Sequence, residues 1–156
     1  MINSQACKVV EVLEPNAIAA STTTDAEFDT ANFENAIIIM SFGAMQNALT
    51  TCSITEGDTS GSADTAIAAL TVGNAACVDV EGTAITLAMT NDSDCIVFHV
   101  DLRKRARYLA FNSVTVSGGT SAHSVHALLF NGDTVDMSTN AGAALASTGT
   151  GVVSVV

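Results

Sequence analysis

The sequence predicts an all-β protein, an antiparallel β-sandwich or barrel, on three observations. Short segments of strand-like composition recur at intervals of roughly 8–15 residues, separated by Gly, Asn, Asp and Ser clusters, which is the spacing typical of sandwiches. No long amphipathic helical period lies between these segments. Apolar residues make up 48% of the chain but include no Trp and one Tyr, so we expect a core of small side chains between two packed sheets.

The strands are expected in the following order. Residues 7–13 alternate around Val10 and Val12, and residues 35–42 form a continuous apolar run that favours a strand buried on both faces. Residues 47–55 place Ala48, Thr50, Cys52 and Ile54 on one side, whereas the Ala-rich segment 65–72 fits either strand or helix. The remaining predicted strands cover 76–80, 83–89, 95–102, 107–116 and 124–130.

The strand predicted over 107–116 changes the parity of its apolar residues. Leu109 and Phe111 share one side, but Val114 and Val116 fall on the other. A β-bulge near residues 112–113 would restore a single apolar face by adding one residue to the strand.

The chain divides into a β-sandwich domain, residues 1–130, and a C-terminal tail or arm, residues 131–156, rich in Ala, Ser, Thr and Gly. Such a composition is flexible. The last five residues, VVSVV, are β-prone and uncharged, so that Val152, Val153, Val155 and Val156 are candidate interface residues. They are expected to pair with a sheet edge of their own domain or with that of a neighbouring molecule.

The charge excludes several classes of partner. The net charge is −11, with five basic and sixteen acidic residues, too few cations for binding nucleic acid through its phosphates or for an anionic membrane surface. No run of about 18 apolar residues is present to span a bilayer, and no secretory signal is visible at the start. The four cysteines, which contain no C-x-x-C pair, are expected to be free, buried thiols of a reducing compartment.

The sequence offers no reaction centre, and we expect neither enzymatic activity nor a metal or other cofactor. His123 and His126 are three residues apart in a predicted strand and therefore face opposite sides, and His99 lies between apolar strand residues. Carboxylates gather in segments 55–64 and 90–95, but without the spacing of a calcium loop, so we interpret both as solvated turns. No nucleophile elbow or phosphate-binding glycine pattern occurs.

Two stretches carry a resemblance to a known family. They are DTANFENAIIIMSFGAMQNALTTCSITEGDTSGSADTAIA (29–68) and RARYLAFNSVTVSGGTSAHSVHALLF (105–130). Their order of strands and turns resembles tailed-bacteriophage head decoration proteins, also called capsid cement proteins, over roughly residues 8–130. The resemblance implies an antiparallel β-sandwich that is jelly-roll-like. It also implies a virion component on the outside of the capsid, assembled in the host cytoplasm, that acts as a homotrimer and clamps adjacent subunits of the major capsid protein.

Four of the five basic residues, Arg103, Lys104, Arg105 and Arg107, form one cluster between two predicted strands. It is either a solvated turn or a patch that meets acidic residues of a sister subunit or of the capsid, since arginine pairs well with carboxylates. Two alternative functions stay open. One is a minor tail or neck component of the virion, and the other is a β-sandwich module that binds a glycan or Ca²⁺.

Overall fold

The computed structural model describes residues 7–46, 49–86, 95–115 and 119–131. The residues in these ranges form eight strands and one short 3-10 helix, η2 (Leu102–Lys104), with no α-helix. The strands are β1 (Cys7–Ile18), β2 (Thr23–Asp29), β3 (Asn35–Met45), β4 (Leu49–Gly57), β5 (Thr65–Thr71), β6 (Cys95–Asp101), β7 (Tyr108–Thr115) and β8 (Ser121–Phe130). No helix that could cross a membrane occurs in this part of the chain.

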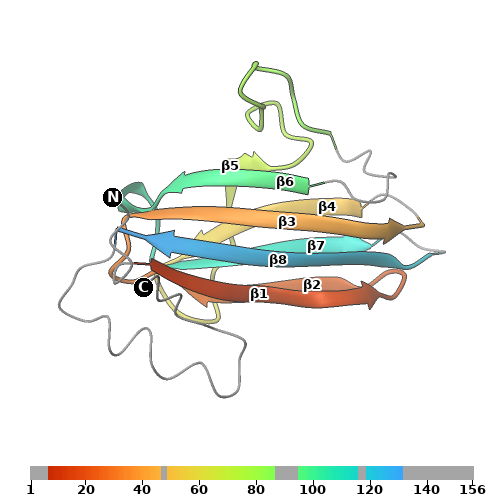
Figure 1. The fold of residues 1–156 in the computed structure, drawn as a ribbon, viewed down its shortest axis with the longest axis horizontal. Helices are drawn as coiled ribbons and strands as arrows, with labels where there is room; N and C mark the ends of the chain where they lie inside the picture. The colour runs from red at the N-terminus through yellow and green to blue at the C-terminus, as the bar shows by residue number, and fades with distance from the viewer. Residues whose placement is uncertain (1–6, 47–48, 87–94, 116–118, 132–156) are drawn as a thin grey trace, which may run out of the picture.

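The strands form two four-stranded antiparallel sheets, in the orders β1-β8-β3-β6 and β2-β7-β4-β5, which face each other as two layers (Figure 1). The first strand pairs with the last, β2 with β7, β3 with β6, and β4 with β5. This nested pairing is that of one long hairpin rolled into two sheets, which is the jelly-roll arrangement. The predicted all-β sandwich is therefore confirmed.

The core fills the space between the sheets. Ile38, Ile54, Leu109 and Phe111 are completely buried, and each lies at an inward position of its strand. Most of these side chains are aliphatic and small, as expected from the composition, and the rest of the core comes from phenylalanine and methionine of both sheets. Burying such side chains stabilises the fold by about 1.5–3 kcal/mol each.

The prediction that residues 35–42 are buried on both faces is wrong. Along β3 the side chains of Ala36, Ile38 and Met40 are buried, whereas Ile37 and Ile39 between them are only half-buried. They lie on the outer face of the first sheet, which no helix or further sheet covers among the described residues. A continuous apolar run thus marks a strand with one face in the core and an apolar outer face.

The predicted bulge near residues 112–113 is wrong as well. β7 keeps an unbroken register with β2 from Val114 to Tyr108, so Ser113 and Thr115 follow Leu109 and Phe111 on the inner face. Both are buried, and both hydrogen-bond inside the sandwich. The apparent change of parity arises because two polar residues, Ser113 and Thr115, occupy inward-facing positions of the strand. The core accommodates them because each forms a hydrogen bond.

Thr115 joins the first turn to the centre of the second sheet. Its hydroxyl donates to the carbonyl of Ala19 at 2.6 Å and accepts from the amide of Thr22 at 2.9 Å. The β1–β2 connection is thereby fixed at the point where the chain passes from one sheet to the other.

Other expectations need correction in detail. Residues 65–71 are strand, which settles the ambiguity left by the sequence. Residues 76–80 and the described part of 83–89 are not strands, because they fold into turns with a single bridge between Val78 and Ala84. In β4 the register shifts between Leu49 and Thr51, which leaves Thr50 exposed instead of beside Cys52 and Ile54.

All four cysteines are free, as expected, but they are not all buried. Cys52 and Cys77 belong to the core, where burial, with a smaller contribution from Cys77, raises the pKa of Cys52 to about 12. Cys7 is half-buried and Cys95 is exposed at the start of β6. The predicted tail, residues 131–156 with the valines of VVSVV, lies outside the described residues except for Asn131.

Gly57 ends β4, where the chain turns toward β5, and backbone atoms of the turn lie close to it. A Cβ at residue 57 would meet the carbonyl oxygen of Ser62 and lie 2.8 Å from the Cα of Ala63, and a backbone cannot move aside as a side chain tip can. We expect Gly57→Ala to lower the free energy of unfolding by about 1–3 kcal/mol in urea denaturation.

Gly43 in β3 provides the matched control. A Cβ there would lie 3.5 Å from the Cβ of Ala122, which is ordinary contact, so Gly43→Ala is expected to leave stability unchanged or to raise it slightly. Equal losses in the two variants would contradict the close approach at Gly57.

Candidate interaction surface

The structure pairs every member of the basic cluster with an acid of the same chain. The side chain of Arg103 binds Asp101 through both carboxylate oxygens, at 2.9 and 3.1 Å, and Lys104 lies 3.8 Å from the same carboxylate. These two cations are the more exposed pair, with side chains 63% and 78% accessible. They stabilise their own turn, where Asp101 also accepts from the Arg103 amide as the N-cap of η2.

Arg105 and Arg107 instead tie the β6–β7 connection to the second sheet. Arg105 binds Glu56 of β4 at 3.2 Å, and the same carboxylate accepts from the amide of Ala106. Arg107 makes two hydrogen bonds to Asp29 of β2, at 2.7 and 3.0 Å, and lies over the ring of Tyr108. The Arg107 guanidinium accordingly holds the pKa of Asp29 below its usual range.

The cluster therefore has a role within the subunit that the sequence alone did not reveal. Its partners Glu56 and Asp29 lie 49 and 78 residues away along the chain, so no local pattern indicates them. The hypothesis that the four cations also meet a sister subunit or the capsid stays a prediction.

His123 is the one histidine placed in the core, and it joins the two sheets. Its side chain lies between Phe42 and Phe111, and Nε2 is 3.1 Å from the hydroxyl of Ser113 in β7. Nδ1 is buried without a hydrogen bond of normal geometry, although the backbone of Ser121 is close enough to interact with the ring. Burial lowers the pKa of His123, and the contact with Ser121 opposes this shift in part.

This Ser113–His123 pair is structural. Both residues are buried, at 0% and 3% exposure, and their hydrogen bond joins β7 to β8 across the core. His126 and His99 lie on the outside of the same sheet, which confirms that His123 and His126 face opposite sides.

Only one of the two carboxylate-rich segments lies wholly within the described residues. Segment 90–95 lies mostly outside the described residues. In segment 55–64 the turn is held by Glu27, which accepts from the Ser60 hydroxyl at 2.9 Å and from the Gly61 amide. Within the described ranges no three His, Cys, Asp or Glu side chains come close enough to hold a metal ion.

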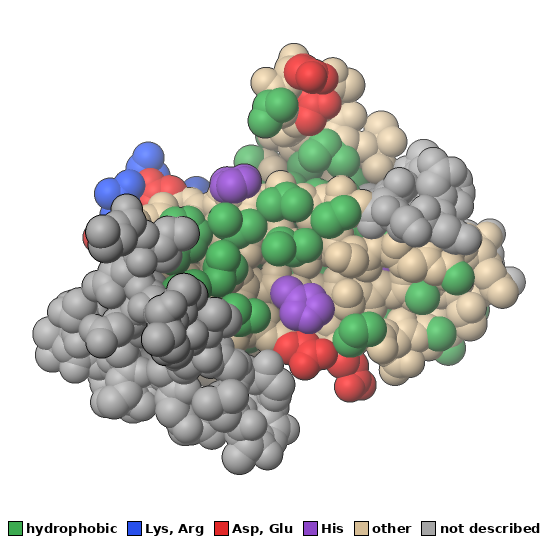
Figure 2. Space-filling model, in the orientation of Figure 1, with side chains coloured by type: hydrophobic (Ala, Val, Ile, Leu, Met, Phe, Trp, Pro, Cys, Tyr) green, Lys and Arg blue, Asp and Glu red, His purple; other side chains and the backbone are tan. Residues whose placement is uncertain are grey.

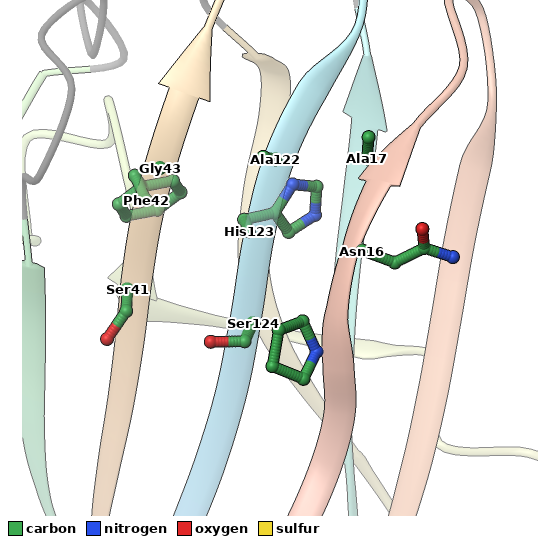
Figure 3. Close-up of a pocket in the computed structure, with 9 residues that line it drawn as sticks. Asn16, Ala17, Ser41, Phe42, Gly43, Ala122, His123 and Ser124 are labelled. Atoms are coloured by element: carbon green, nitrogen blue, oxygen red, sulfur yellow. The ribbon is translucent and has the colours of Figure 1, made fainter.

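A shallow depression of about 400 Å³ lies over β1, β3 and β8. Its floor is made of small side chains, including Gly43, Ala122 and Ser124, so that the backbone of the sheet is close to the surface (Figure 3). No exposed aromatic side chain lines it, and the ring of Phe42 belongs to the core. The depression lacks the aromatic platform and the converging polar groups of a small-molecule site.

The most distinctive surface is the outer face of the β1-β8-β3-β6 sheet, composed of two rows of directly opposed side chains. One row is Val9, Leu128, Ile37 and His99, and the next is Glu11, His126, Ile39 and Val97. All eight are half-buried or exposed, and five are aliphatic. Figure 2 shows hydrophobic side chains gathered on this face beside two histidines. A contiguous apolar patch on so acidic a protein indicates an interaction surface.

This outer face continues into a groove of about 700 Å³ at the edge of the sheet. One wall is β6, which pairs only with β3 in the described structure. The other wall is the β5–β6 excursion, residues 72–86, which rises beside β6 in Figure 1. The three most exposed large aliphatic side chains, Val78 (46%), Val80 (102%) and Val97 (47%), all line this groove.

The excursion is an ordered wall because it forms hydrogen bonds within itself. Gly73 donates to the Ile85 carbonyl at 2.8 Å, and Ile85 donates to that of Cys77 at 2.9 Å. The carboxylate of Asp79 accepts from the amides of Glu81 and Thr83, which shapes the tip. Sequence reasoning missed this groove, since Val78 and Val80 alternate as they would in a strand.

Comparisons with known proteins do not show a family for this chain. No family model and no curated protein matches this sequence. Among solved structures, two chains of a family 86 glycoside hydrolase, one wild-type and one mutant, each in complex with neoagarooctaose, are similar at a TM-score of 0.42 and 12% identity. A beta-porphyranase of the same family from the human gut bacterium Bacteroides plebeius is similar at a TM-score of 0.40 and 16% identity. The matches cover 79% of this chain but only 18% to 20% of those chains.

The buried histidine predicts a loss of stability at mildly acidic pH. The unfolded chain protonates His123 near its usual pKa of about 6.5, whereas the folded state does so only at lower pH, so unfolding takes up a proton between the two values. The contribution of His123 to stability is complete above this window and is lost as the pH falls through it. We expect the urea midpoint to decrease from pH 7.5 to 5.5.

The double variant His123→Leu with Ser113→Ala removes the titrating ring and its partner together, which avoids an unpaired buried hydroxyl. The decrease in midpoint should be smaller in this variant than in the wild type, whatever its absolute stability. His99 and His126 are present in both proteins, so any contribution they make cancels in the comparison. An unchanged decrease would mean that other groups cause it.

The two pairs of cations in the basic cluster are expected to affect the Tm of the protein differently. Replacing Arg105 and Arg107 by Ser breaks contacts between the β6–β7 connection and the second sheet, and calorimetry should show a lower Tm. Replacing Arg103 and Lys104 by Ser, the matched control, removes only exposed local pairs and should change Tm little. Equal losses of Tm in the two variants would contradict this difference between the two pairs. Light scattering on the variant without Arg103 and Lys104 tests whether these two cations contribute to assembly.

Proposed function

We propose that the protein is a non-enzymatic structural protein of a tailed-bacteriophage virion, a decoration or cement protein bound to the outer surface of the head. Its partner is the major capsid protein, which it binds as a homotrimer and whose adjacent subunits it clamps. The resemblance of residues 29–68 and 105–130 to this family suggests the role, and the jelly-roll frame is compatible with it.

The observation that carries the proposal is the outer face of the β1-β8-β3-β6 sheet. Val9, Ile37, Ile39, Leu128 and Val97 form an apolar surface on a rigid sheet, and burying such a surface against a partner is the main favourable term in most association. The net charge of −11 per chain keeps free trimers from aggregating with one another until the shell offers a complementary surface. Many weak contacts then add through avidity on a repetitive shell.

Several polar side chains of the described residues hold the fold together. Ser113 and His123 bind each other in the core, and Asp29 and Glu56 bind arginines. A protein that only adds to a shell needs a stable frame and a surface, and stabilises the shell by binding its assembled form. These features support a structural role over an enzymatic one.

Binding to capsids tests the proposal through two matched substitutions. Leu128→Glu places a charge on the outer face in a central strand, and Val114→Glu does the same on the outside of the other sheet, where Val114 is also half-buried in a central strand. We expect Leu128→Glu to weaken binding to expanded heads lacking this protein at least about tenfold, since burying a lone charge is costly. Val114→Glu should bind almost as the unsubstituted protein does.

Co-sedimentation with the heads measures the affinity, and circular dichroism verifies that both variants are folded. If the unsubstituted protein fails to bind the heads, the proposed function is wrong. Saturable binding of a glycan or of Ca²⁺ by the purified protein, without binding to heads, would favour the ligand-binding alternative.

A further inference from the structure

The groove between β6 and the β5–β6 excursion combines two features of a site for an added β-strand. β6 has hydrogen-bonding groups of its backbone on the side away from β3, and the described residues supply no ladder there. Beside this edge lie the apolar side chains of Val97, Val78 and Val80. In strand addition, backbone bonds supply affinity and pockets for alternate side chains supply specificity.

The groove also opens toward the core. Inward-facing Phe98 of β6 and Leu70 of β5, an edge strand of the other sheet, line it together with Ile96. A strand added to β6 would therefore direct one set of side chains toward Phe98 and Leu70 and the other set alongside Val97. An occupant with apolar side chains on both faces fits such a site.

The last five residues of this chain have these properties. In a strand, Val153 and Val155 point to one face, and Val152 and Val156 to the other. Five residues span about 17 Å, less than the roughly 23 Å of the seven-residue β6. From Met137 to Val156 the chain carries no charged side chain, so the side chains of this segment add no repulsion toward an acidic surface.

The length of chain before VVSVV is sufficient to reach a second molecule. β8 ends beside the corresponding end of β3 and β6, since Phe130 lies opposite Asn35 and Asn35 opposite Asp101. Reaching β6 of the same molecule means passing one strand, about 10 Å. The 20 residues of 132–151 extend to about 66 Å and exceed by far the 2–6 residues of ordinary connections.

We propose that residues Val152–Val156 of one molecule add as a strand to the free edge of β6 in a second copy, in the groove under the β5–β6 excursion. Each molecule then donates one arm and accepts another, and exchange of identical elements is an economical route to a closed oligomer. The proposal rests on the proposed function only for its biological purpose, because self-association needs no capsid.

Analytical ultracentrifugation of the full chain and of a chain ending at Gly151 tests the role of the arm. The full chain should associate in a concentration-dependent manner, and removal of residues 152–156 should weaken this association at least about tenfold, that is, by about 1.4 kcal/mol. A matched variant, Thr148→Asp with Thr150→Asp, leaves VVSVV intact and should associate more strongly than one with Val153→Asp and Val155→Asp.

Two substitutions test the acceptor. Val97→Lys places a charge in the groove on the edge strand β6, and Thr23→Lys places the same charge at an exposed site on β2, an edge strand of the other sheet. Only Val97→Lys should reduce association, because lysine on an edge strand opposes strand addition. Equal effects of the two lysines would overturn the assignment of the groove.

A cysteine pair distinguishes a second copy from the same molecule. Antiparallel addition places Val156 near the exposed thiol of Cys95 at the start of β6, so Val156→Cys under mild oxidation should give covalent oligomers on a non-reducing gel. Cys95→Ser in this background should abolish them. A disulfide formed only within one molecule, a monomeric full chain at all concentrations, or unchanged association after truncation would each overturn the proposal.

These outcomes are separable from those of the capsid experiment. Association that depends on the arm, together with no binding to heads, would overturn the proposed function and keep the interface. Binding to heads by a chain whose association ignores residues 152–156 would do the reverse.

Discussion

The roll depends on the pairing of β1 with β8, the contact that joins the two ends of the nested strand order. Every other pair lies inside this one along the chain, and only β4 with β5 is a local hairpin. Pairing between strands that are distant along the chain costs loop-closure entropy, which the burial of apolar side chains must offset. The core provides this burial. β8 lies between β1 and β3 and contributes three fully buried side chains, Val125, Ala127 and Leu129.

Buried polar residues then fix how the two sheets lie against each other. Ser113 of β7 meets His123 of β8 across the core, and Thr115 holds the turn where β1 becomes β2. Apolar side chains of similar volume would fill the same space without directional bonds. Satisfied polar pairs specify one arrangement of the sheets, at the cost of a histidine whose protonation the fold disfavours.

The sequence predicts the class of fold well because strand spacing and turn residues are local properties. Strands β1, β3, β4, β6, β7 and β8 were all expected near their observed positions. Local sequence patterns do not show which distant residue each side chain contacts. Ser113 resembles a disruption of an apolar face until His123 is placed opposite, and Val78 and Val80 resemble a strand until the hydrogen bonds of Gly73 and Asp79 are seen.

The interaction surface illustrates the same limit. Ile37 and Ile39 are apolar whether they face a core or a partner, so the residue types alone do not distinguish the two positions. The groove requires residues near 78 and near 97 to meet across the open side of the sandwich, which only the rolled topology brings about. The cation cluster was visible in the sequence, but its acids were too far along the chain to assign.

The opposition of Cys7 and Phe130 in neighbouring strands means that the chain enters and leaves the roll at the same end. A short peptide joining these positions would close the strand order into a ring, so that new termini opened in the exposed turn around residues 58–62 would leave every pair of strands intact. A cargo joined directly at Cys7 or after Phe130 would project from this one end, leaving the far end of the sandwich, with its turn at residues 19–22, unobstructed.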